Sequence, residues 1–149
     1  MERGDLCLVE VLGFDWRPGQ ACGILGKFGS AGIALSYLSV GNGASDEKNM
    51  SFCVKTAALA EHREIIEEIK TEFTPKKIKV NAPVVIVTLY GPHFLERHTL
   101  ASEVFSSLCV DGIISHSVVS SINSISVVID VPDRDRVVAC FRQKFEWPE

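Results

Sequence analysis

The sequence contains no apolar stretch long enough for a membrane-spanning helix, although 46% of its 149 residues are hydrophobic. Such a helix needs about 20 consecutive, mostly apolar residues. The N-terminus also lacks the pattern of a secretory signal peptide, because residues 1–5 lead directly into a short strand-like segment. We therefore expect a soluble protein of the cytoplasm that does not act at a membrane.

Paired cysteines and clustered basic residues are also missing. The five cysteines form no CxxC pair and lie within apolar patterns, which favours reduced, buried thiols. Nucleic-acid binding needs a concentrated basic surface. The net charge is −4, however, and the only basic cluster is the short segment 75–79, so we expect no nucleic-acid partner.

The sequence lacks the residue sets that carry most enzyme chemistry: a nucleophile with a base, paired carboxylates or a phosphate-binding loop. Three glycines recur every three residues within 23–29, but they fall inside a helical pattern, where they favour close helix packing over phosphate binding. His93, His98 and His116 show no HxH or HxxxH spacing that would indicate a metal site. We expect no enzyme activity, no metal and no cofactor.

The most informative feature of the chain is an internal repeat. Eight positions of the segment 14–33 recur without a gap 80 residues later, with identical or similar residues. The matching pairs are Phe14 and Phe94, Arg17 and Arg97, Ala21 and Ala101, Ile24 and Val104, Leu25 and Phe105, Phe28 and Leu108, Gly32 and Gly112, and Ile33 and Ile113. The repeat predicts two small modules that share packing surface. We place them at residues 1–82 and 83–149.

Hydrophobic periodicity gives the order of elements in each copy. The first copy has predicted strands at 6–12, 34–40, 49–55 and 77–81, a helix from 19 that closes at the glycines 29–32, and an amphipathic helix at 59–73. The second copy has predicted strands at 84–90, 115–120 and 124–130, and helices at 99–111 and 133–145. The first copy thus has the βαββαβ order of a ferredoxin-like module, an antiparallel sheet with two helices on one face.

The second copy has no obvious fourth strand, because residues 146–149 (EWPE) are poor strand formers. Its sheet edge must be left open, covered, or completed by another strand. This unfinished edge favours a homodimer.

The apolar strand, the glycine-containing loop, the helix that ends in Gly-Ile and the Ser-rich turn before an Ile-Ser-Val-Val strand together resemble tandem ACT domains. The resemblance is greatest to the C-terminal regulatory half of aspartate kinases. Its best stretches are 17–21 with Gly32-Ile33, and 104–108 with Gly112-Ile113 and 121–129. It implies an α+β fold of two ferredoxin-like ACT modules and a homodimer that pairs their sheets and helices.

This resemblance implies a non-catalytic sensor. ACT domains of this kind bind a free amino acid at an interface between domains and transmit the binding to an enzyme of amino-acid metabolism. Only residues 1–5 precede the first predicted strand, so we expect a free-standing regulatory module or a fragment. The alternative is a degenerate ACT module that dimerises and binds a partner protein without a small ligand.

The loop before the first helix is the expected effector site. Pro18 fixes φ at the helix start, and Gly19 lets a ligand approach the unpaired N–H groups of the first turn, which attract a carboxylate. Asp15 is the only acidic side chain of this loop and is expected to receive an ammonium group. The expected contact residues are Phe14, Asp15, Trp16, Arg17, Pro18, Gly19, Gln20, Ala21, Ser36 and Ser39. Because no second acidic side chain is visible near Ser36, we expect a small neutral amino acid and not lysine.

Two features of this site leave alternatives open. Phe14 and Trp16 either wall the effector pocket or anchor the loop against the neighbouring repeat. The second copy has a weaker counterpart of the site, made of His98, Thr99, Leu100 and His116, in which His98-Thr99 replaces Pro18-Gly19.

Overall fold

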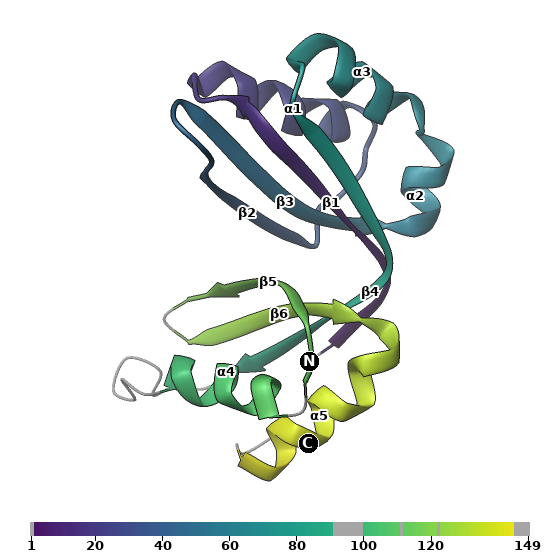
Figure 1. Ribbon diagram of the computed structural model, residues 1–149. Coiled ribbons are helices and arrows are strands. Elements are labelled where there is room, and N and C mark those ends of the chain that lie inside the picture. Colours follow the sequence, from purple (N-terminus) through teal and green to yellow (C-terminus); the bar gives the residue numbers. More distant parts are fainter. Residues whose placement is uncertain (1, 91–99, 111, 122, 145–149) are drawn as a thin grey trace. The chain divides into compact units, whose positions relative to one another are not determined.

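The computed structural model describes residues 2–90, 100–110, 112–121 and 123–144, and at positions 2–4, 100–101 and 143–144 only the backbone. Along the chain the elements are β1 (Glu2–Asp15), α1 (Pro18–Ser30), β2 (Tyr37–Asn42), β3 (Glu47–Lys55), α2 (Thr56–Glu61), α3 (Glu64–Phe73), β4 (Lys77–Tyr90), α4 (Leu100–Val110), β5 (Ser115–Ser120), β6 (Ser124–Asp130), the short 3-10 helix η1 (Val131–Asp133) and α5 (Arg134–Lys144). Hydrogen bonds link the strands in the order β2-β3-β1-β4-β6-β5 (Figure 1). The pairs β1–β3, β2–β3, β4–β6 and β5–β6 are antiparallel, and the predicted α+β class is confirmed.

The chain divides into two compact units. The first unit is Leu6–Ala82, and the second unit combines Met1–Asp5 with Pro83–Glu149. Both β1 and β4 therefore begin in one unit and end in the other. The predicted division at residue 82 placed residues 1–5 with the first module, whereas the structure groups them with the second unit.

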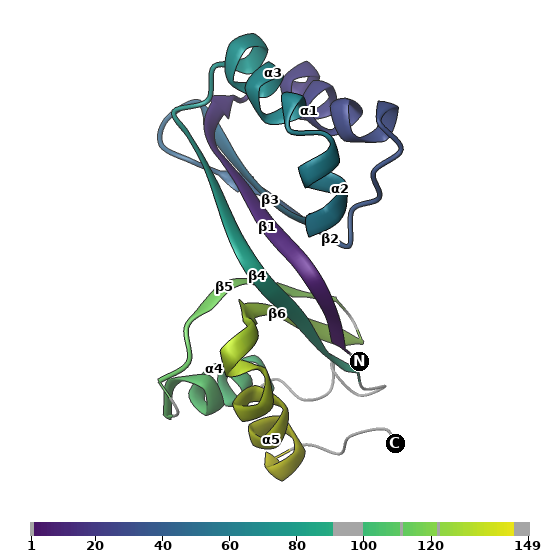
Figure 2. The same ribbon diagram turned by 90° about the vertical axis from the view of Figure 1, so that its right-hand side faces the viewer.

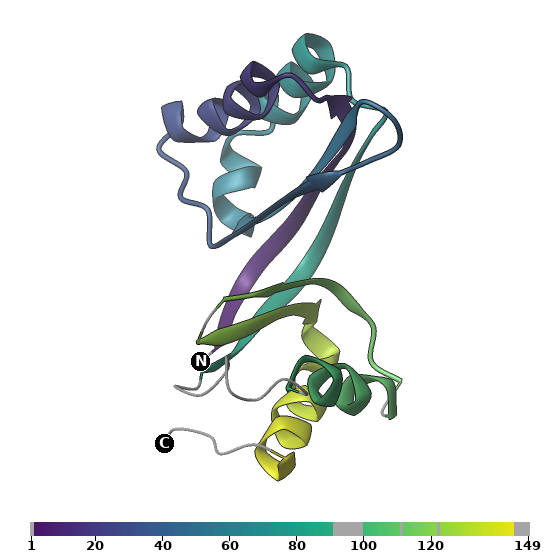
Figure 3. The same cartoon turned by 90° about the vertical axis from the view of Figure 1, so that its left-hand side faces the viewer.

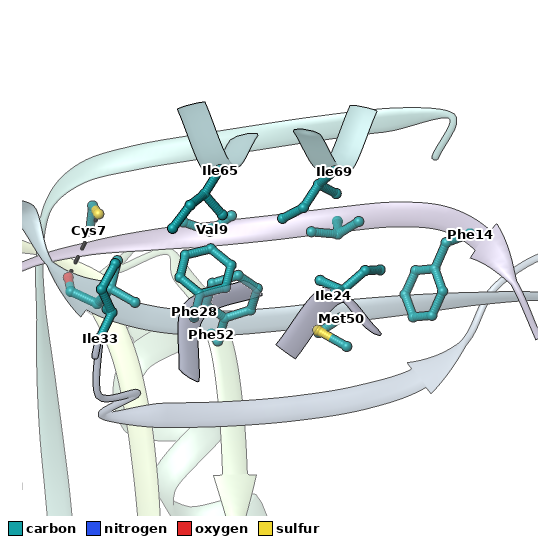
Figure 4. Close-up of a cluster of buried hydrophobic side chains, with 12 residues drawn as sticks. Cys7, Val9, Phe14, Ile24, Phe28, Ile33, Met50, Phe52, Ile65 and Ile69 are labelled. Carbon is teal, nitrogen blue, oxygen red and sulfur yellow. Dashed lines mark hydrogen bonds between the residues drawn. The ribbon is translucent and has the colours of Figure 1, made fainter. Parts of the chain in front are cut away.

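The first unit has its helices on one face of its strands (Figure 2). Alternate residues of β1 and β3 point toward α1 and α3, as the two-residue period of a strand requires. The buried cluster consists of Cys7, Val9, Val11, Phe14, Ile24, Phe28, Ile33, Met50, Phe52, Val54, Ile65 and Ile69 (Figure 4). At its centre the rings of Phe28 and Phe52 meet edge to face with centroids 4.8 Å apart, a favoured aromatic arrangement.

The core of the second unit also lies between strands and helices, but it is made of different side chains. Alternate positions of β4 and β6 point toward α4 and α5, which lie on one face of these strands (Figure 3). The buried cluster consists of Val85, Val87, Leu89, Val104, Leu108, Ile113, Ile125, Val127, Ile129, Val137 and Phe141. It holds a single aromatic side chain, Phe141, and the position that matches Phe28 is Leu108.

The repeated Gly-Ile dipeptide closes the first helix of each unit with the same turn. After α1, the N–H groups of Gly32 and Ile33 donate to the carbonyls of Gly29 and Phe28. After α4, Gly112 and Ile113 donate to the carbonyls of Cys109 and Leu108 in the same way. Both glycines have positive φ, +73° and +65°, which an L side chain rarely adopts. This hydrogen-bond pattern is a Schellman motif, and it explains why the repeat is strictest at these positions.

The strand that completes the second unit was not predicted. β1 begins at Glu2, several residues before the predicted start, and neighbours β4 in the sheet. Its first residues belong to the second unit, so the beginning of β1 takes the place of the fourth strand that the sequence pattern did not reveal. Residues 145–149 lie outside the described part of the chain. The unfinished edge therefore no longer argues for a dimer.

Two other boundaries differ from the prediction. The predicted strands 77–81 and 84–90 form one continuous strand, β4, since the fixed φ of Pro83 is compatible with extended backbone. The predicted helix 59–73 is two helices, α2 and α3, because His62 leaves helical geometry at φ −126° and ψ 46°. The predicted strands 115–120 and 124–130 are confirmed as β5 and β6.

Two glycines of α1 and two of the five cysteines differ from the prediction. A Cβ on Gly23 would lie 2.6 Å from the Phe73 ring, so this glycine does allow close packing, but Gly26 and Gly29 face open space. Cys22 and Cys109 are exposed, while the remaining cysteines are buried. Burial raises the pKa of Cys53 to about 12, and therefore this thiol stays protonated at neutral pH.

No helix of the described residues is long and apolar enough to cross a membrane.

Candidate functional site: the turn between β1 and α1

The turn begins at a bulge in β1. The register of β1 on β3 shifts between Leu12 and Phe14, and Gly13 between them has φ +71°. Its N–H donates to Asn49 Oδ1 at 2.9 Å, and its carbonyl accepts the Lys76 N–H at 3.3 Å. A Cβ on Gly13 would lie 2.9 Å from the Lys76 Cβ atom. Only glycine fits here, and the bulge sets the direction in which the chain leaves the sheet.

The two aromatic residues of the turn differ in burial. Phe14 is 1% exposed and packs with Ile24 and Met50 in the first unit's core (Figure 4). Phe14 thus belongs to the core of its own unit, which is neither of the two roles expected for it. The Trp16 side chain is exposed, with 53% of the residue accessible, and the Trp16 backbone N–H donates to the Asp46 carbonyl at 3.1 Å. Its ring is therefore the aromatic surface that this turn presents to solvent.

Asp15 and Arg17 form a closed pair. Asp15 Oδ1 accepts hydrogen bonds from the Arg17 backbone N–H at 2.9 Å and from Arg17 Nε at 3.0 Å, and Asp15 Oδ2 accepts one from Arg17 Nη2 at 2.7 Å. These hydrogen bonds lower the pKa of Asp15 and raise that of Arg17. The carboxylate that was expected to receive an ammonium group is thus already paired with Arg17, while the Arg17 side chain remains 69% exposed.

A second ion pair lies beside the first. Glu47 is the register partner of Asp15, so the two side chains point to the same face of the sheet. Glu47 forms an ion pair with Lys76, in which Oε1 and Nζ lie 2.6 Å apart. The end of β1 therefore gathers two carboxylates and two cations in balanced pairs. Neither Glu47 nor Lys76 was predicted, because their position depends on strand register and no motif marks it.

Helix α1 starts with the expected geometry. Arg17 is the N-cap residue in extended conformation, Pro18 occupies the first helical position, and no side chain caps the helix. The Gln20 N–H donates back to the Arg17 carbonyl at 3.0 Å. Gly19 has nothing within 4 Å of the place where a Cβ would stand, and Ala21 packs partly against the core. The first turn is therefore open to a ligand at Gly19.

The structure does not bring Ser36 and Ser39 to this turn. Asp15 lies beside Glu47 at the start of β3, whereas the Ser36 N–H donates to the carbonyl of Cys53 near the end of that strand. The six steps from residue 47 to residue 53 span roughly 20 Å at about 3.3 Å per residue. Ser39 pairs with Ser51, which lies about 13 Å from Glu47 along β3 at the same rise per residue. Within the first unit, the predicted grouping of these serines with the loop is incorrect.

The second copy's counterpart is only partly described. His98 and Thr99 lie outside the described residues, as does His93, and of Leu100 only the backbone is described. His116 stands at a register shift of β5 on β6, and its Nε2 lies 2.8 Å from Asp130 Oδ1. In the described part of the chain, no three or more His, Cys, Asp or Glu side chains are grouped so as to hold a metal ion.

Comparison with known proteins rests on structure. No family model matches the sequence, and no curated protein does. The regulatory subunit of aspartate kinase from Thermus flavus is 20% identical with a TM-score of 0.87, covering 98% of this chain and 96% of that one. Aspartate kinase from Synechocystis is 19% identical with a TM-score of 0.90, covering 99% of this chain and 26% of that one.

A third similar structure is a ligand complex. E. coli aspartokinase III in complex with lysine and aspartate is 14% identical with a TM-score of 0.71, and the match covers 97% of this chain and 32% of that one. Across nearly its whole length, this chain has the fold of aspartate kinase regulatory subunits and C-terminal ACT regions.

Proposed function

We propose that the chain is a non-catalytic regulatory protein that binds a small amino acid at the turn between β1 and α1 and acts on a separate enzyme of amino-acid metabolism. The fold supports this proposal, since similar solved structures include regulatory subunits of aspartate kinase with almost the same extent as this chain. Those regulatory subunits are separate chains of nearly the same length as this one.

The balanced charges around the turn indicate which class of ligand it would bind. An amino acid is a zwitterion, and the Asp15–Arg17 and Glu47–Lys76 pairs offer both signs of charge beside the open first turn of α1. Arg17 and the helix N–H groups suit the carboxylate, and the carboxylates of Asp15 and Glu47 suit the ammonium group. Because these charges sum to zero, a neutral amino acid fits better than lysine, which would bring an additional positive charge.

Isothermal titration calorimetry with a panel of amino acids tests the proposal. A small neutral amino acid should bind the parent chain, and Gly19→Val should remove binding because its side chain covers the open first turn. Gly26→Val is the matched control, since Gly26 lies in the same helix and also faces open space. A ligand at about 100 times its dissociation constant should add about 2.7 kcal/mol to the stability of the parent in a parallel thermal melt.

The alternative is an interaction module without a small ligand. One observation favours it: the Asp15 carboxylate is already engaged by three hydrogen bonds from Arg17. If the turn is only a structural cap, no amino acid will bind, and Gly19→Val will behave like Gly26→Val in every assay.

A further inference from the structure

The hairpin of β2 and β3 contains an Asn-Gly dipeptide. Asn42 is the last residue of β2 and is exposed, and Gly43 follows it as the first residue of the connection to β3. β2 is an edge strand of the sheet (Figure 1). An asparagine side chain can be attacked by the backbone nitrogen of the next residue, and glycine, which has no Cβ, hinders that attack least.

Lys48 lies opposite Asn42. The two residues are register partners of β2 and β3, so their side chains lie on the same face of the hairpin. Lys48 Nζ donates a hydrogen bond to Asn42 Oδ1 at 3.5 Å. When a nucleophile adds to Asn42 Cγ, negative charge develops on this oxygen, and an ammonium group beside it stabilises that charge. Lys48 is therefore placed to promote attack on the Asn42 side chain.

The Gly43 nitrogen is restrained by the turn. Its N–H donates to the Glu47 carbonyl at 2.8 Å, and this hydrogen bond must break before the nitrogen can attack. Breaking it leaves the ladder intact, because it lies beyond the last pair of β2 and β3, Asn42 and Lys48. Ser45 within the turn has a φ of +50°, which is unfavourable for an L side chain and is relieved when the turn opens.

We propose that Asn42 is a site of spontaneous deamidation, in which the Gly43 nitrogen closes a ring on the Asn42 side chain. The nitrogen forms a bond to Asn42 Cγ, the bond from Cγ to Nδ2 breaks, and ammonia leaves with the proton of the Gly43 N–H. Water from the solvent then opens the cyclic imide. Cleavage of the imide bond to Cγ gives aspartate, and cleavage of the bond to the backbone carbonyl carbon gives isoaspartate. No group is oxidised or reduced.

Either product changes the hairpin that contacts the turn between β1 and α1. Each adds a carboxylate opposite Lys48, and isoaspartate also lengthens the backbone by a methylene group at the last pair of the ladder. The hairpin contacts that turn through the Asp46 carbonyl, which accepts the Trp16 N–H at 3.1 Å. The inference does not depend on the proposed amino-acid site, because neither Asn42 nor Gly43 belongs to that site.

Incubation of the folded chain at mildly alkaline pH, followed by digestion and mass spectrometry, tests the proposal. Cleavage after glutamate places each asparagine in a different peptide: 11–47, 48–61, 73–96 and 104–146. The mass increase of an amide-to-acid conversion should appear first in 11–47, as separate aspartate and isoaspartate products. Lys48→Gln should slow this conversion severalfold. Lys55→Gln, the matched control at the other end of β3, should leave it unchanged.

The same measurement in urea separates the hairpin from the dipeptide itself. In the unfolded chain the Gly43 N–H is released from the Glu47 carbonyl, and Lys48 is no longer held opposite Asn42. The parent and Lys48→Gln should then deamidate at equal rates, and faster than the folded parent. A slower Lys48→Gln in urea would overturn the role assigned to the hairpin.

Conversion confined to 11–47, with both products and with slowing by Lys48→Gln alone, supports the proposal. It is overturned if the folded parent shows no conversion there, if another asparagine peptide converts as fast, or if only aspartate forms. It is also overturned if folded Lys48→Gln converts as fast as the parent. Circular dichroism checks the fold of both variants, and if Lys48→Gln does not fold, the peptide and the products of the parent decide alone.

Discussion

The two units build the same fold and differ in where they place an aromatic ring. In the first unit Phe28 is fully buried against Phe52, and Leu25 lies beside the core. In the second unit the matching pair is reversed, with Leu108 buried and Phe105 half exposed. The Schellman turn after the helix is the same in both. The repeat has thus kept the turn and the apolar face of the helix, while the outer face has changed.

This contrast separates what the fold needs from what each unit adds to it. The first unit adds balanced charges and an open helix start near Asp15, and the second adds apolar surface at the end of α4. Because the first unit has Ser30 and Ala34 where the second has Val110 and Ile114, it serves as an internal control for this apolar surface. We therefore expect variants at matched positions to have unequal effects.

Phe28→Ala should have the largest effect on stability. The ring is fully buried and makes an edge-to-face contact with Phe52, so its removal should lower the free energy of unfolding by about 3–5 kcal/mol. Phe105→Ala, which shortens the exposed ring of the second unit, should change it by less than about 0.5 kcal/mol. Urea unfolding followed by circular dichroism measures both. Equal losses would mean that Phe105 is part of a core and that the contrast between the units is false.

Gly13→Ala should come next. Both Gly13 and Gly32 have positive φ, for which an alanine costs about 1–2 kcal/mol. Gly32 has open space at its Cβ position, but a Cβ on Gly13 would collide with the Lys76 side chain. Overpacking adds about 1–3 kcal/mol, so Gly13→Ala should destabilise the protein more than Gly32→Ala in the same urea experiment. The bulge would not be a constraint if the two variants were equally stable.

Gly23→Ala and Gly26→Ala should have opposite signs. An alanine at Gly26 meets nothing and raises helix propensity, so it should stabilise the protein by about 0.5–1 kcal/mol. An alanine at Gly23 must displace the Phe73 ring, which lies 2.6 Å from the Cβ position, and should destabilise it. Thermal melts of the two variants decide this. A stabilising Gly23→Ala would show that α1 and α3 do not need the close approach.

The pH dependence of Asp15 should be the smallest effect. Hydrogen bonds from Arg17 lower the pKa of Asp15, so the stabilisation from this carboxylate is complete above its ordinary pKa. It is lost as the pH falls through the lowered value. Asp15→Asn should therefore be slightly less stable than the parent at neutral pH and equally stable at strongly acidic pH. A constant difference between the two melting curves across this range would contradict the pairing with Arg17.

Sequence patterns predicted those parts of the fold that local physics determines. The Gly32-Ile33 and Gly112-Ile113 turns follow from the need for positive φ at a helix end, and alternation along 115–120 and 124–130 gave both strands. Features that depend on distant partners were not predicted. The strand at residues 2–5 has too few residues for a pattern, and its role appears only when β4 lies beside it.

The candidate site follows the same division. Pro18 and Gly19 at the start of α1 were predicted from local backbone preferences, and the structure places them there. The Glu47–Lys76 pair and the distance of Ser36 from the turn depend on the register of β2 and β3, which the sequence does not specify. The pairing of Asp15 with Arg17 is local, and their two-residue spacing is the signal that could have indicated it.

Calorimetric titration of the parent and Gly19→Val with a panel of amino acids shows whether the turn between β1 and α1 binds an amino acid. We expect that a small neutral amino acid binds the parent at one site per chain, that lysine does not, and that Gly19→Val abolishes binding while Gly26→Val retains it. Binding of lysine without any neutral amino acid, or no binding by any member of the panel, would contradict the assignment of this turn as an amino-acid site.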